Sequence, residues 1–142
     1  MREMNSSRLV TACAVLVLLL ALLGAVGIRT FLAPCVHEDG SFGSCHWAGA
    51  ALFGLFLLMG ATALAAAAIR DLRMREGLFL GLLGEALYGL FLPGPLIRLC
   101  SMATMRCQCI TRPGAMVALV LTMVLAAAGA ILSHRGRKDG HP

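Results

Sequence analysis

The chain has 142 residues, of which 59% are hydrophobic and 13% are charged, and its formal net charge is +5. A soluble domain needs about 25% charged residues, so the composition excludes an ordinary soluble globular protein. The positive charge does not indicate nucleic-acid binding, because the basic residues lie between apolar runs, where topology signals occur.

Four apolar runs follow one another, at about residues 9–28, 47–69, 77–97 and 114–132. Each comes close to the roughly 20 residues that a helix needs to cross about 30 Å of hydrocarbon. We expect Pro93-Gly94-Pro95 to bend or end the third helix. The sequence therefore predicts an all-α fold in which residues 1–142 form one integral membrane domain, a four-helix transmembrane bundle.

The connections predict the orientation of this bundle. A loop at 29–46 and a loop at 98–113 alternate with a tight turn at 70–76. Eight Lys and Arg residues lie on the side of the termini and the turn, and four on the side of the two loops. Because positive charge is retained in the cytoplasm, we expect a multi-pass protein of the cell membrane, N-in and C-in, with both loops outside.

The first run could be either a transmembrane helix or a cleaved signal peptide. It has a basic start and an Ala25-Val26-Gly27 that a signal peptidase could accept. Its apolar stretch of roughly 19 residues exceeds the usual 7–15. We therefore expect a retained span.

At the start of the second run, Trp47 fits an interfacial anchor.

One acid interrupts the third run. Gly77, Gly81, Gly84, Glu85 and Tyr88 share one helical face, at spacings of three and four. Small residues let helices approach closely in lipid, and a carboxylate at this depth costs a few kcal/mol unless it is neutralised or paired. We expect this face to point into the bundle.

Two roles for Glu85 remain open at this stage. It could form a proton or cation relay site. Alternatively, a protonated Glu85 hydrogen-bonds to Tyr88, Thr62 or Thr122 and only fixes the packing. The second role is favoured, because no second titratable group accompanies it in the apolar runs.

Six cysteines divide between the first run and the loops. Cys13 lies within the first run, where we expect it to pack. The other five fall on the predicted outer side, and they are Cys35, Cys45, Cys100, Cys107 and Cys109. An oxidising compartment favours pairing, of Cys35 with Cys45 and of Cys100 with Cys107 or Cys109, which leaves one thiol over.

A soft-metal site is a second interpretation of the loops. Met102, Met105, Cys107 and Cys109 form M-x-x-M-x-C-x-C, and His37 and His46 lie in the other loop. Thioether and thiolate ligands select Cu(I).

Thiol–disulfide exchange with a quinone is a third interpretation. Four spans with cysteines in both outer loops match the general layout of quinone-linked disulfide-forming membrane enzymes. Arg106 beside Cys107 and His46 beside Cys45 could lower the thiol pKa values. No C-x-x-C is present.

A weak internal repeat relates the two loops. Cys35 lies 14 residues before Gly49-Ala50, and Cys100 lies 14 residues before Gly114-Ala115. The spacing suggests two parallel hairpins related by an axis along the membrane normal.

The loop strings also resemble a known family. Cys35-x9-Cys45-His46-Trp47, with Asp39-Gly-Ser41 inside it, is followed by Cys100-x-Met102-x-Thr104-Met105-Arg106-Cys107 and Thr111-x-Pro113. This pattern resembles an uncharacterised bacterial and archaeal family of four-span membrane proteins, known only as a domain of unknown function. The resemblance implies a four-helix membrane protein and no established activity.

The favoured function is an accessory or interaction subunit with disulfide-stapled outer loops. The chain contains no Ser-His-Asp set, phosphate-binding glycine loop or H-E-x-x-H motif, so an enzyme is not favoured. The expected partners are the lipid bilayer and another membrane protein or a second copy, and no nucleic acid.

Overall fold

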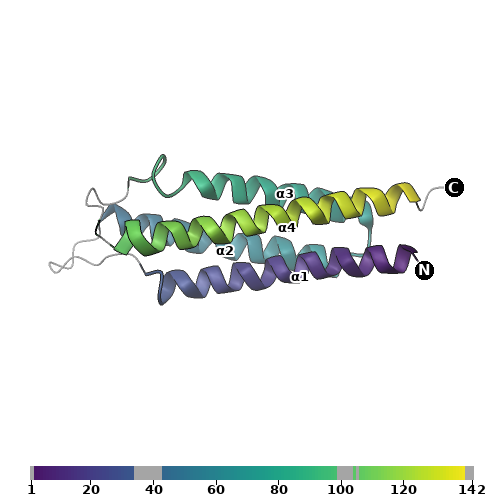
Figure 1. Cartoon of the computed structure of the whole chain (residues 1–142), viewed down its shortest axis with the longest axis horizontal. Coiled ribbons are helices and arrows are strands. Elements are labelled where there is room, and N and C mark those ends of the chain that lie inside the picture. The colour runs from purple at the N-terminus through teal and green to yellow at the C-terminus, as the bar shows by residue number, and fades with distance from the viewer. Residues whose placement is uncertain (1, 34–42, 99–103, 105, 140–142) are drawn as a thin grey trace.

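The computed structural model describes residues 2–33, 43–98, 104 and 106–139. Four long α-helices and one short π-helix make up its regular structure (Figure 1). They are α1 (Arg2–Arg29), α2 (Ser44–Ala68), α3 (Leu72–Phe91), the π-helix η1 (Cys107–Thr111) and α4 (Arg112–Asp139). The predicted all-α architecture with four helices is confirmed.

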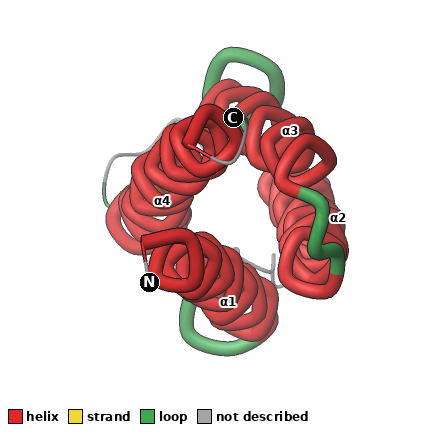
Figure 2. The backbone as a smooth tube through the Cα atoms, turned by 90° about the vertical axis from the view of Figure 1, so that its right-hand side faces the viewer, coloured by secondary structure: helices red, strands yellow, loops and turns green. Residues whose placement is uncertain are grey.

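The helices alternate in direction and surround a common core. Both chain ends lie at the same end of the bundle as the α2–α3 turn (Figure 1). Viewed along its axis, each helix has two neighbours, and α1 lies diagonally across from α3 (Figure 2). We call residues 2–10, 66–76 and 130–139 the turn end, and the described residues of 27–33, 43–53, 89–98 and 104–116 the loop end.

Three of the four helices are long and apolar enough to cross a membrane. They correspond to the predicted runs at 9–28, 47–69 and 114–132, the second of which ends one residue earlier, at Ala68. The fourth, α3, is not confirmed as a span, because Arg73, Arg75 and Glu76 lie in its first turns and Glu85 lies further along. The part of α3 that follows Glu76, residues 77–91, extends only ~22 Å as a helix, which is less than the thickness of the hydrocarbon.

The helix α3 differs from the predicted run at 77–97 at both ends. The turn between α2 and α3 ends at Asp71, whose Oδ1 accepts a hydrogen bond from Arg73 N at 2.9 Å, so α3 begins five residues before Gly77. At the other end, α3 stops at Phe91, before Pro93, as expected from the Pro-Gly-Pro sequence. Gly94 then takes a positive φ of 127°, and its N donates to Ile97 O at 3.0 Å.

Large side chains fill the centre of the bundle. The largest fully buried ones are Phe56, Phe79, Leu52, Met59, Leu82 and Leu119. The two phenylalanines each cover a glycine of the neighbouring helix in the same hairpin. A Cβ on Gly24 would lie 2.7 Å from the Phe56 ring, and a Cβ on Gly129 would lie 2.5 Å from the Phe79 ring. These two positions therefore need glycine for helix contact.

The two hairpins are packed in related registers. Each buried position of α3 follows a buried position of α1 by the same interval that separates Cys35 from Cys100. The pairs are Val10 and Arg75, Ala14 and Phe79, Val17 and Leu82, Ala21 and Ala86, and Gly24 and Gly89. This agreement is in line with the repeat suggested by the loop spacing.

Candidate functional site

The cysteines of the loop end lie on the first turns of two helices. Cys45 is on α2 and Cys107 begins η1, and both are buried, whereas Cys109 is exposed. No disulfide joins any two of the four cysteines that the structure describes, which also include the half-buried Cys13. Cys35 and Cys100 lie outside the described residues. The predicted staples, each of which needs one of these two, are therefore not supported by a described bond and stay predictions.

The candidate copper ligands are only partly within the described residues. His46, Cys107 and Cys109 are described, whereas His37, Met102 and Met105 are not. In the described ranges, no group of three or more His, Cys, Asp or Glu side chains could hold a metal ion. The copper site thus stays a prediction that depends on the thioethers.

The π-helix that carries Cys107 and Cys109 is tied to the end of α1. The Thr111 hydroxyl donates to Leu32 O at 3.0 Å, and this hydrogen bond is buried. Leu32 in turn packs on Gly114, where a Cβ would lie 2.6 Å from Leu32 Cδ2. π-Helices occur often at functional sites. The sequence predicted a loop here, because the extra residue of a π turn leaves no periodic signal.

The acid in α3 has the partner that one prediction named. Thr62 Oγ1 lies 2.9 Å from Glu85 Oε1 and 3.1 Å from Leu58 O. The Thr62 hydroxyl can donate to either oxygen, so one side-chain hydrogen bond connects Glu85 to α2. Glu85 Oε2 is buried without a partner in the described part of the chain. The contact links α2 to α3 and favours the packing role over the relay.

The face of α3 that carries Glu85 does not point into the bundle. Gly77, Gly81 and Gly84 are exposed, and a Cβ built on any of them would meet no atom within 4 Å. Tyr88 is 56% exposed, and Glu85 is half-buried at the edge of this face. The prediction of an inward face is wrong for these four residues. We call Gly77, Gly81, Gly84 and Tyr88 the glycine face of α3.

The opposite face of α3 lies toward the interior of the bundle instead. Its buried residues are Arg75, Phe79, Leu82, Ala86 and Gly89. The Phe79 ring fits over Gly129 of α4, and a Cβ on Gly89 would lie 2.6 Å from Leu55 and 2.7 Å from Leu119. The helical spacing grouped the glycine face correctly but placed it on the wrong side. The inward position of Phe79 depends on Gly129, which lies fifty residues away in the chain.

The sequence did not predict the burial of one arginine at the turn end. Arg75 is 3% exposed, and its guanidinium donates to three carbonyl oxygens, at Ile69, at Ala67 (3.2 Å) and at Ser7 (3.5 Å). Two of these carbonyls lie at the C-terminal end of α2, where a cation is favourable. Desolvation by burial lowers the pKa of Arg75. The sequence showed it only as one of three turn arginines.

An ion-pair cluster lies at the same end. Glu76 of α3 contacts His134 Nδ1 through Oε1 and Arg137 NH1 through Oε2, both at 3.0 Å. Arg137 also contacts His134 at 3.2 Å. These residues join α3 to α4. Because they lie far apart in the chain, no local sequence pattern predicted their contact.

The comparisons with known proteins identify a family and no activity. Neither a curated protein nor a solved structure matches the chain. A family model described as a domain of unknown function, DUF4418, matches residues 6–132, which include all four long helices nearly in full. The chain therefore belongs to the DUF4418 family.

Proposed function

We propose that this protein is a membrane-embedded accessory subunit that offers the glycine face of α3 to a transmembrane helix of another protein chain. The observation that carries the proposal is the outward direction of this face. Three glycines with open space above them form a flat surface beside the exposed ring of Tyr88. In lipid, such surfaces allow close helix approach and gain dispersion contacts.

The composition of α3 supports the same conclusion. Of the four long helices, α3 alone is not apolar enough to qualify as a span. It carries a half-buried carboxyl group whose Oε2 has no partner among the described residues. A polar helix with an uncovered face of small residues is poorly matched to lipid and better matched to protein.

The filled core favours a surface role over transport. Phe56, Phe79 and Met59 are at most 1% exposed and occupy the space between the helices. A polar pathway along the axis would have to displace these side chains. The surfaces and the loop end are therefore the places where this chain can act.

Photo-crosslinking in native membranes tests the proposal. A photoreactive phenylalanine analogue replaces Tyr88 on the glycine face, and the same analogue replaces Leu58, which is 54% exposed on α2, as the matched control. We expect a discrete adduct with a polypeptide from position 88 and none from position 58. Gly81→Leu should abolish the adduct, whereas Gly54→Leu, at another open glycine on α2, should preserve it. The absence of a discrete adduct from position 88 contradicts the proposal.

Thiol–disulfide exchange is the second candidate function. The observation in its favour is the π-helix, which holds the exposed Cys109 two residues from the buried Cys107 at the loop end. In such a cycle, two thiols become a disulfide and pass two electrons and two protons to a quinone. The test is reoxidation of the reduced protein by a soluble quinone, followed by mass spectrometry. An unchanged number of thiols after quinone addition excludes this activity.

A further inference from the structure

The loop-end arginines have no acidic partner among the described residues. Arg29, Arg98, Arg106 and Arg112 lie there, and the described residues of the loop end include no Asp or Glu. Arg106 contacts Phe31 O at 3.5 Å and Arg112 contacts Gln108 Oε1 at 3.3 Å, and neither contact is an ion pair. Within the described ranges, the ion pairs lie at the turn end. Counted over both loops, four arginines face two acids, so the loop end has an excess of positive charge that favours anions.

Arg29 is the best-placed of these arginines for a ligand. It ends α1, and its guanidinium carbon lies 4.3 Å from the centre of the Phe53 ring on α2. A cation over an aromatic ring is held by the ring face, and the five N–H donors of the guanidinium stay available. Phosphate oxygens fit this planar set of donors better than any other common anion except a carboxylate.

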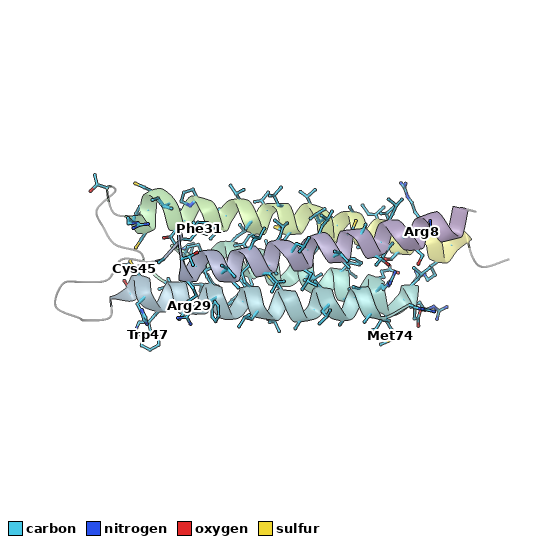
Figure 3. All side chains as sticks on the ribbon, turned by 90° about the horizontal axis from the view of Figure 1, so that it is seen from below. Arg8, Arg29, Phe31, Cys45, Trp47 and Met74 are labelled. Atoms are coloured by element: carbon cyan, nitrogen blue, oxygen red, sulfur yellow. The ribbon has the colours of Figure 1, made fainter. Side chains whose placement is uncertain are left out.

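The surroundings of Arg29 suit a lipid. Trp47 and Phe31 are 63% and 61% exposed, and they lie with Arg29 at the loop end (Figure 3). Exposed aromatic rings at a helix end are typical of the membrane–water interface. Ala50 and Gly54 follow Trp47 on the exposed side of α2, and a Cβ on Gly54 would meet no atom within 4 Å. These small residues leave room for an acyl chain against the helix.

We propose that Arg29 binds the phosphate of an anionic phospholipid, whose acyl chain lies beside Trp47 against Ala50 and Gly54. An anionic headgroup is preferred to a zwitterionic one, because the two loops carry four arginines against two acids, Glu38 and Asp39. The lipid site lies on α1 and α2, away from the glycine face of α3, so this inference does not depend on the proposed function.

Trp47 provides a local test, because it is the only tryptophan in the chain. The protein is reconstituted in phosphatidylcholine vesicles in which one lipid in five carries brominated acyl chains, either on phosphatidylglycerol or on phosphatidylcholine. Bromine quenches tryptophan fluorescence only near contact. We expect brominated phosphatidylglycerol to be enriched about fivefold at Trp47, as expected for one arginine near an anionic surface.

Matched variants assign the preference to Arg29. Arg29→Gln should remove most of it, and Arg29→Lys should retain part of it, because the charge remains without the planar donors. Arg8→Gln removes the same charge at the opposite end of the bundle and should leave the preference unchanged (Figure 3). Equal quenching by the two brominated lipids in the unmodified protein overturns the proposal. So does an unchanged preference in Arg29→Gln, or loss of the preference on addition of inorganic phosphate, which would indicate a site for the free anion.

Discussion

The two ends of the bundle are held together by different interactions. At the turn end, Arg75 donates to carbonyls of α1 and α2 and of the turn, and Glu76 contacts His134 and Arg137 of α4. At the loop end, apolar contacts and the buried Thr111 hydrogen bond connect the helices, and the arginines lack ion pairs with described residues. Charged side chains therefore connect the helices at the turn end, whereas the described arginines of the loop end form no such ion pairs.

The largest effect should follow from removal of the buried guanidinium at the turn end. Arg75→Met leaves three carbonyl oxygens without a donor, and two of them lie where α2 ends. We expect the free energy of unfolding in mixed micelles to fall by about 3 kcal/mol. Arg73→Met is the matched control, because Arg73 is exposed. If both variants lose the same stability, Arg75 does not hold the turn end together.

A smaller loss is expected from the ion-pair cluster. Glu76→Gln keeps the shape of the side chain and removes the charge that faces His134 and Arg137. We expect a loss of about 1.5 kcal/mol at low ionic strength, and a smaller difference from the unmodified protein at high salt. Measurements of unfolding at two salt concentrations check this, and a difference independent of salt would indicate packing instead of charge.

The loop end should respond to the loss of its buried hydroxyl. Thr111→Val preserves the volume but leaves Leu32 O without its donor, so we expect a loss of about 1 kcal/mol. Thr122→Val is the control, because the Thr122 hydroxyl donates to Ala118 O within α4 itself. An equal response of the two variants would show that the contact with Leu32 does not join η1 to α1.

The smallest effect should follow from loss of a loop-end arginine. Arg98 is exposed, so Arg98→Gln should change the unfolding free energy by less than about 0.5 kcal/mol. A loss of stability comparable to that of Arg75→Met would show that arginines at both ends of the bundle stabilise the fold to the same degree.

The apolar runs predicted the helices because length and hydropathy are local properties. The Thr62 partner of Glu85 was also predictable, since few polar residues lie at that depth. The inward face of α3 was not, because Phe79 lies inside only where Gly129 makes room for its ring. Arg75 looked like a solvated topology charge, and its burial depends on carbonyls that the end of α2 leaves unsatisfied. Orientation in the membrane stays a prediction from charge counts.

The glycine–phenylalanine contacts also limit how the bundle can move. Phe79 over Gly129 fits only one axial position, because the α4 residues one turn away are all larger than glycine: Leu125, Ala126, Leu132 and Ser133. The α3–α4 hairpin therefore resists a lengthwise shift between its two helices. In a bilayer of a different thickness, this hairpin should respond by tilting as a rigid pair.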